Sequence, residues 1–524
     1  MGKRGFLGHI FTVGAFIMLS RVLGLVREML QSRLIGAGVE QSAFTLAFAI
    51  PNMARKLFGE GALTAAFVPI FREEVDTVGL EKAARLARAV MTMVLLLLGA
   101  AVVLALSGIL SALTVRDFSL FTFHFSLSDR ATLSLGLIAI LMPYMLAICG
   151  AAFGMGVLNA LGRFKASSFM PALLNIIWIA ALAALTLVPG LSLVARVRFV
   201  AAAILVGGFA QMAFMFVCMA RAGVKPYPLF SGWRTERVRL VWHNLAIAAA
   251  GAGAVQVNYM LDQILGQLAA PWAAGVIGYA ERLMDLPLGV IGVAFGTVLL
   301  PTFAGFFAKN DAEGAREAMA VSVRNMMYVM IPAAAGLCVL APEVTCVIYQ
   351  GGSFDAVATT RVSRALAVYA VGLGFFGLQK SLIPWFQAQK DMKTPLRVSL
   401  VTVIVNATLN ILAVWLLPEE WRHVGLAAST VLCALLGCIL LLYAASTTPS
   451  AFFLHLFSPP LLFYLFRILL ASLAMVTVLV FVRPFASLPP IPNLAVLIAE
   501  GLFVYGIFSI LLRIFRIPRR VARV

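Results

Sequence analysis

Apolar stretches of about 20 residues recur along the whole length of the chain, and a helix needs about that many to cross the hydrocarbon core of a bilayer. The chain is 62% hydrophobic and only 12% charged, whereas soluble proteins are about half apolar and a quarter charged. Short segments that alternate apolar and polar residues are not repeated, which argues against an outer-membrane barrel. The sequence therefore predicts an all-α protein that crosses the membrane many times.

We expect about fourteen transmembrane helices separated by short polar segments. The first follows Lys3 and Arg4 as the core of a signal peptide would, but no small-residue cleavage site comes after it, so we interpret it as a retained helix. The expected helices cover residues 8–36, 40–71, 84–113, 131–160, 168–189, 197–221, 236–268, 271–306, 313–342, 358–387, 394–417, 423–446, 461–483 and 493–516.

Lysine and arginine fall mainly in alternate loops between these helices. With the N-terminus inside, the inside segments hold about three times as many as the outside segments, which predicts that both termini are cytoplasmic. The net charge of +18 then arises from topology determinants, so we do not expect nucleic-acid binding. The six cysteines lie singly and the five histidines are scattered, so no metal site is predicted.

Charged residues also lie inside the first two predicted helices, where an arginine costs about 2.5–3.5 kcal/mol. Arg21 and Arg27 share the first helix with Glu28, and the second carries Arg55 and Glu60. Because the acids do not balance the cations, we interpret the set as a cavity that binds an anion, and the guanidinium fork suits phosphate. The alternative is that these charges form buried ion pairs that only fix helix packing.

The seventh and eighth predicted helices add further charges. Glu281 and Arg282 join the candidate binding residues, and Arg282 could pair with Asp285 at i, i+3. Asp262 is a lone acid on the seventh helix, so it is a candidate to bind a coupling cation, Na⁺ or a proton. A pair with a neighbouring base such as Lys380 is the alternative.

Catalytic motifs are absent from the sequence. It has no G-x-S-x-G, no Walker loop and no H-E-x-x-H, so we expect neither an enzyme nor a bound cofactor, apart from a possible coupling cation.

A short pattern appears twice at helix ends. The sequence Phe-Val-Pro-Ile-Phe at residues 67–71 and Leu-Leu-Pro-Thr-Phe at 299–303 are 232 residues apart, close to six helices. This spacing predicts parallel six-helix repeats. We therefore expect an N-lobe at residues 1–225, a C-lobe at 226–450, and two added helices with a basic tail at 451–524.

Several longer motifs stand out, and those in the first seventy residues are the most specific. They are Ser20–Glu28, Gly36–Gly38, Pro51–Asn52, Phe58–Ala62 and Phe67–Pro69, followed later by Glu281–Met284, Gly292–Thr297, Leu300–Pro301 and Asp391–Pro395. Together they resemble the MurJ/MviN-type lipid II flippases, which belong to the multidrug/oligosaccharidyl-lipid/polysaccharide (MOP) exporter superfamily. The resemblance runs from about residue 10 to residue 410 and weakens over the last two helices.

This resemblance implies two MATE-like six-helix lobes around a central cavity, plus two helices that form a groove for a lipid tail. Asp262 resembles a sodium ligand that some members carry, whereas Ser42 stands where many members have an acid. The cavity charges that the resemblance implies are Arg21, Arg27, Arg55, Arg282, Glu28 and Glu60.

The implied substrate is lipid II, an undecaprenyl-diphosphate-linked disaccharide–pentapeptide. Alternating access would move it from the inner to the outer leaflet of the bacterial inner membrane, driven by the membrane potential or a coupling cation. We expect a monomer that contacts membrane lipids and the cell-wall synthesis machinery. The alternatives are an exporter of another polyprenyl-linked oligosaccharide or of drugs, and a membrane scaffold that transports nothing.

Overall fold

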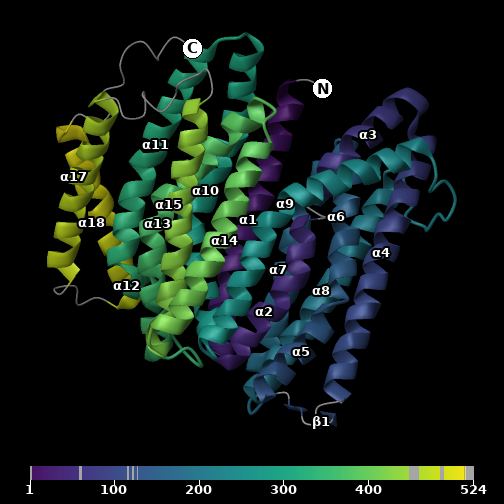
Figure 1. Ribbon diagram of the computed structural model, residues 1–524, viewed down its shortest axis with the longest axis horizontal. Coiled ribbons are helices and arrows are strands. Elements are labelled where there is room, and N and C mark those ends of the chain that lie inside the picture. Colours follow the sequence, from purple (N-terminus) through teal and green to yellow (C-terminus); the bar gives the residue numbers. More distant parts are fainter. Residues whose placement is uncertain are drawn as a thin grey trace. The chain divides into compact units, whose positions relative to one another are not determined.

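The structure is a computed structural model, and the described part of the chain is almost entirely helical (Figure 1). Apart from one short hairpin, its elements are helices, which confirms the all-α prediction. The described residues are all except 1–2, 58–61, 115–116, 121–122, 127, 448–458, 484–488, 513 and 515–524.

Ten helical segments in this described part are long and apolar enough to cross a membrane. Each coincides with one of the fourteen predicted spans. The other four predicted spans are also helical where they are described, and they contain every charged candidate residue that the structure describes. The count of fourteen crossings is consistent with this structure and remains a prediction.

Contacts divide the chain into two compact units. Unit 1 is Met1–Gln267 together with Gly351–Phe354, and unit 2 is Leu268–Gln350 together with Asp355–Val524. The lobes predicted from the sequence, with boundaries after residues 225 and 450, remain a prediction.

Unit 1 contains one antiparallel hairpin among its helices, in a segment predicted as a loop. The hairpin pairs Asp117 with Ser126. The elements are α1 (Lys3–Ile35), α2 (Val39–Ala54), α3 (Ala62–Val78), α4 (Leu80–Thr114), β1 (Asp117–Leu120), β2 (Phe123–Ser126), α5 (Asp129–Leu141), α6 (Tyr144–Ala160), α7 (Phe164–Thr186), α8 (Leu193–Arg221) and most of α9 (Glu236–Ala269).

Glycines allow helices α6 and α8 to pack closely, side by side (Figure 1). A Cβ added at Gly150 would lie 2.7 Å from Sδ of Met212, and one added at Gly208 would overlap the ring of Tyr144. Lipid offers no hydrophobic drive for helices to associate, so close van der Waals contact through small residues is a main source of their affinity. These two glycines therefore set the separation of α6 and α8.

Two predicted helices of unit 1 are interrupted. Where it is described, the span predicted at 40–71 consists of α2, which continues through Pro51, a wider π-helical turn over residues 55–57, and α3. The span at 131–160 breaks between α5 and α6, where Pro143 comes directly before Tyr144. Proline lacks the N–H that continues a helix, and the sequence analysis gave too little weight to Pro143 as a point of interruption.

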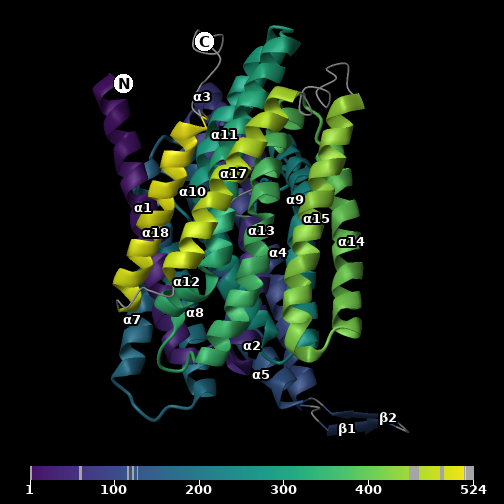
Figure 2. The ribbon, with the colours of Figure 1, turned by 90° about the vertical axis from the view of Figure 1, so that its left-hand side faces the viewer.

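Unit 2 is built around α13, which packs against α10, α11 and α15. Its glycines face large side chains, for example Gly377 against Met326 and Met330. Figure 2 shows α14 beside α15 and α17 beside α18. The helices are α10 (Ala273–Ala308), α11 (Ala312–Val339), α12 (Ala341–Tyr349), α13 (Ala356–Ala388), α14 (Lys393–Leu416), α15 (Glu419–Thr447), α17 (Pro459–Val482) and α18 (Pro490–Leu511). The short helix α12 was not predicted.

Candidate functional site

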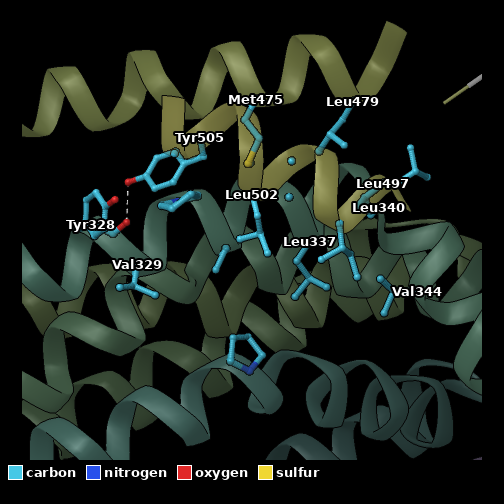
Figure 3. Close-up of a pocket in the computed structure, with 17 residues that line it drawn as sticks. Tyr328, Val329, Leu337, Leu340, Val344, Met475, Leu479, Leu497, Leu502 and Tyr505 are labelled. Carbon is cyan, nitrogen blue, oxygen red and sulfur yellow. Dashed lines mark hydrogen bonds between the residues drawn. The ribbon is translucent and has the colours of Figure 1, made fainter. Parts of the chain in front are cut away.

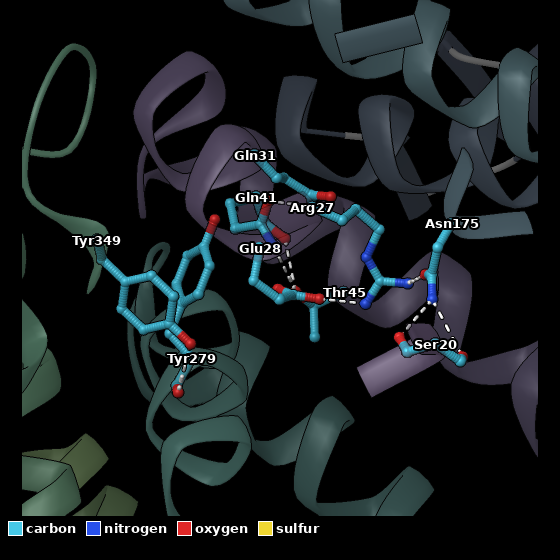
Figure 4. Close-up of polar contacts among 9 residues, drawn as sticks. All are labelled: Ser20, Arg27, Glu28, Gln31, Gln41, Thr45, Asn175, Tyr279 and Tyr349. Atoms are coloured by element: carbon cyan, nitrogen blue, oxygen red, sulfur yellow. Dashed lines mark hydrogen bonds and ion pairs between the residues drawn. The ribbon is translucent and has the colours of Figure 1, made fainter. Parts of the chain in front are cut away.

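Arg27, in the last third of α1, contacts Asn175, Glu28 and Trp178, and Figure 4 shows the first two of these contacts. Its Nη1 donates a hydrogen bond of 2.9 Å to Oδ1 of Asn175, and its Nη2 forms an ion pair with the Glu28 carboxylate. The guanidinium carbon lies 4.3 Å from the centre of the Trp178 ring, in cation–π geometry. The candidate residues Arg27 and Glu28 are thus brought together with two residues of α7 that the sequence analysis did not name.

These contacts are shielded from solvent, which strengthens them because the local dielectric constant is low. The side chains of Arg27 and Glu28 are 14% and 8% exposed. Asn175 is itself fixed, because its Nδ2 donates to the backbone oxygen of Ser20 at 3.0 Å. Asn175 and Trp178 are three residues apart, so both lie on the face of α7 that meets α1. The sequence did contain a signal for these two residues, because Asn175 is a polar amide within an apolar segment, one turn before Trp178.

Arg55 lies in the π-helical turn that follows α2 and is half-buried. Its Nε and Nη2 donate to Oδ1 of Asn52, at 3.1 Å and 2.9 Å. The next residue, Lys56, places its ammonium 5.0 Å from the centre of the Tyr259 ring of α9. Such π-helical turns occur frequently at functional sites. Glu60, the other candidate on this segment, lies outside the described residues.

A buried row of hydrogen-bonded polar side chains lies where α1 meets α2. Nε2 of Gln31 donates to Oε1 of Gln41 at 3.0 Å, and Nε2 of Gln41 donates to Oγ1 of Thr45 at 3.3 Å. Beside it, Nε2 of Gln267 donates to the backbone oxygen of Ser42 at 2.6 Å. The Ser42 hydroxyl is buried and has no hydrogen-bond partner in the part of the chain that is described. Ser42 is the position at which the family resemblance led us to look for an acid.

Arg21 is more exposed than Arg27 and lines a separate cavity of about 440 Å³ formed by α1, α6 and α7. Arg27 is not among the described residues that line this cavity. A cavity shared by the two arginines of α1 remains a prediction.

The remaining candidates lie on α9 and α10. Asp262 is 8% exposed, and its Oδ2 accepts a hydrogen bond of 3.3 Å from Nδ2 of Asn258, one turn earlier. On α10, Oε1 of Glu281 accepts from the hydroxyl of Tyr369 at 3.4 Å, and Arg282 is half-buried. The convergence of Arg282 with the arginines of α1 and α2 and the pairing of Asp262 with Lys380 remain predictions.

Unit 2 also holds an apolar cavity of about 610 Å³ between α11, α12, α17 and α18 (Figure 3). Side chains such as Leu337, Leu497 and Met475 form its walls, and Pro287 of α10 contributes to the lining. The hydroxyl of Tyr505 is not free at this surface, because it donates to the backbone oxygen of Tyr328 at 2.7 Å. The cavity is suited to a hydrocarbon chain.

Membrane-length helices in two units, with arginine and carboxylate side chains buried in one of them, define a polytopic membrane protein of the transporter class. The fold agrees with solved structures of such transporters. An inward-facing multidrug resistance MATE family transporter of the MOP superfamily matches with a TM-score of 0.65 and 15% identity, over 83% of this chain and 98% of that one. A lipid II flippase MurJ in an inward closed conformation matches with a TM-score of 0.76 and 24% identity, over 96% and 98%.

Sequence comparison gives the family. The model described as lipid II flippase MurJ matches residues 31–491. A probable lipid II flippase MurJ of Rhizobium tropici is 33% identical over 420 residues, which are 79% of this chain and 76% of the relative. The lipid II flippase MurJ of Burkholderia cenocepacia is 33% identical over 440 residues, 82% of each chain. The chain belongs to the MurJ family of lipid II flippases, which confirms the resemblance noted in its sequence.

Proposed function

We propose that this protein moves lipid II from the inner to the outer leaflet of the bacterial cytoplasmic membrane by alternating access. The names of its relatives support the substrate, and the arrangement around Arg27 supports the chemistry. A head group made of a diphosphate, two sugars and a peptide cannot cross hydrocarbon unaided, because each polar group without a partner costs several kcal/mol, roughly 2–7 by transfer measurements.

Arg27 carries the proposal. Asn175 and Trp178 hold the guanidinium in place before any ligand binds, so little side-chain entropy is lost when a phosphate arrives. The nitrogen that contacts Glu28 is the one that a phosphate oxygen can take over. Exchange of one carboxylate for a phosphate keeps the guanidinium of Arg27 neutralised throughout. Arg55, Arg282, Glu60 and Glu281 complete the proposed binding set.

The apolar cavity of unit 2 supports a site for the undecaprenyl tail. Its walls come from α17 and α18, the two helices expected to form a lipid-tail groove, and from α11 and α12. Burial of each CH₂ group stabilises binding by about 0.8 kcal/mol. The tail would therefore remain in an apolar environment along α17 and α18 while the head group moves.

The membrane potential would drive the movement. One charge that moves through 100 mV gains about 2.3 kcal/mol. A diphosphate with about two negative charges, leaving a negative interior, gains roughly twice that amount. Binding of Na⁺ or a proton at Asp262 is the second possible source of energy. In this proposal both termini are cytoplasmic and a monomer is sufficient.

Complementation tests the proposal directly. The chain should restore growth to a bacterium depleted of its own lipid II flippase, and Arg27→Glu should fail because it places a second carboxylate beside Glu28, where a phosphate must bind. Arg85→Glu is the control, because Arg85 is 63% exposed and pairs with Glu81 one turn away. Immunoblots of membranes should show all three proteins at similar levels. Growth supported by Arg27→Glu contradicts the role of Arg27, and a well-accumulated wild-type chain that restores nothing contradicts the proposed function.

A further inference from the structure

The cavity beside Arg21 has a polar side that the proposed function does not yet use. It lies between the first half of α1, the end of α6 and the start of α7, with a volume of about 440 Å³. Its apolar wall consists of Val13, Ile17, Met155, Phe164 and Pro171. Its polar wall consists of Ser20, Arg21, Asn159, Ser167 and Ser168.

Two polar groups in this wall have no partner among the described residues. They are Oδ1 of Asn159 and the hydroxyl of Ser167, both buried, and Ser167 is 7% exposed as a residue. The neighbouring Ser168 differs, because its hydroxyl donates to the backbone oxygen of Phe164 at 2.9 Å. Buried polar groups in folded proteins nearly always have a hydrogen-bond partner. A ligand in this cavity can supply the missing partners.

The chemistry of the wall specifies that ligand. Arg21 is the only cation among the described lining residues. Its guanidinium can bind two oxygens of one carboxylate or phosphate group. A hydroxyl and a carboxamide can each donate and accept, so they match a group that has N–H donors as well as acceptors. A diphosphate offers acceptors alone. A carboxylate next to a peptide amide offers both, and its negative charge suits the guanidinium of Arg21.

We propose that this cavity holds the carboxylate end of the substrate's peptide, while the diphosphate is held elsewhere, at Arg27. The inference rests on the proposed function, because only a substrate with a peptide would fill the cavity in this way. Its place in the chain fits the path of the head group. Ser167 lies in the first turn of α7, close in the chain to Arg163 and Lys165, at the end of this helix that is predicted to be cytoplasmic, where the head group enters.

Two lipids distinguish a peptide site from a diphosphate site. Affinities of the purified full-length chain in nanodiscs should be measured for lipid II and for the same undecaprenyl-diphosphate disaccharide without its peptide. Wild type should bind lipid II more tightly. Arg21→Gln and Ser167→Ala should each weaken lipid II binding about tenfold, the loss expected for a hydrogen bond to a charged or buried group, and leave the peptide-free lipid unchanged.

Controls separate this inference from the proposed function. Ser168→Ala removes a hydroxyl that is already satisfied, so lipid II binding should not change. Arg27→Gln should weaken the binding of both lipids. Equal losses for the two lipids in Arg21→Gln and Ser167→Ala would assign the cavity to the diphosphate, and no loss in either variant would show that it holds no part of the head group. A wild-type chain that binds neither lipid contradicts the proposed function instead.

Discussion

At the scale of single residues, the site depends on amides and aromatic rings as much as on charges. Arg27 meets one acid, one amide and one indole ring, and Arg55 meets an amide. The amides of Asn175 and Asn52 and the ring of Trp178 are neutral, so they fix these guanidinium groups without cancelling their charge. The Glu28 carboxylate balances the charge of Arg27, and it is this partner that an arriving anion would replace.

Asp262 provides a residue-scale prediction about energy coupling. Its carboxylate is buried and accepts a hydrogen bond from Asn258. If a cation binds here during transport, Asp262→Asn should reduce lipid II transport at least tenfold and remove its dependence on sodium or on external pH, since one charged ligand is lost. Transport into proteoliposomes, with the sodium and pH gradients varied separately, measures this effect. If transport is unchanged and keeps the same ion dependence, Asp262 serves in helix packing and not in energy coupling.

The candidate site was only partly predictable from the sequence. Arg27 and Glu28 were found because charges stand out in an apolar segment. Asn175 was not, because it is 148 residues from Arg27 in the chain and only the packing of α7 on α1 brings them together. Spacing along one helix gives an angle between side chains, but it does not show which neighbouring helix each one meets.

At the scale of helices, prediction succeeded wherever length and apolar character were sufficient. The ends of α8 and α13 lie within a few residues of the predicted ends. Helix α12 has nine residues, too few to cross a membrane, and its apolar character merged with that of α11. The break after α5 depends on Pro143, which either bends or interrupts a membrane helix according to its neighbours.

The contact of α6 with α8 gives a prediction for stability. Gly208→Ala should lower the free energy of unfolding by about 1–3 kcal/mol, the usual cost of overpacking, because the new methyl group would overlap the Tyr144 ring. Thermal unfolding of the full chain in detergent would show a lower Tm. Gly136→Ala on α5 is the matched control, because a Cβ there meets nothing within 4 Å. Equal Tm values for the two variants would contradict the tight packing of these helices.

The start of α14 gives a prediction for pH dependence. Hydrogen bonds from the Thr394 side chain, and from the backbone N–H groups of Thr394 and Lys393, hold the pKa of Asp391 below its ordinary value of 3.8. A carboxyl whose pKa is lower in the folded state stabilises the protein above the ordinary pKa, and this stabilisation is lost as the pH falls through the lowered folded value.

Asp391→Ala should therefore lower stability at pH 7 by about 1 kcal/mol, as for other residues that cap a helix start. The difference from wild type should shrink as the pH falls below 3.8. Thermal unfolding measured from pH 7 downward tests this dependence. Asp391→Asn keeps an acceptor that does not titrate, so its Tm should show less of this pH dependence than the wild type. A constant difference between Asp391→Ala and wild type at every pH would contradict the assignment.

At the scale of the whole molecule, the number and direction of the crossings can be tested. Fusions of a reporter that is active only in the periplasm should be inactive after Gly232 and after Val524, and active after Gly190, since the basic residues gather on the side of the first two positions. Fusions of a reporter that is active only in the cytoplasm should give the opposite pattern. A periplasmic signal at Val524 would overturn fourteen crossings with both termini inside.

The position of Arg27 also constrains how the protein is synthesised. Helix α1 leaves the ribosome well before α7, yet it carries several charges that enter hydrocarbon poorly by themselves. Asn175, which holds Arg27, comes 148 positions later. At about 5–20 residues per second, it follows after roughly 7–30 s of translation. We therefore expect α1 to be retained at the insertion machinery until α7 emerges. The two helices, although far apart in the sequence, would then enter the bilayer together.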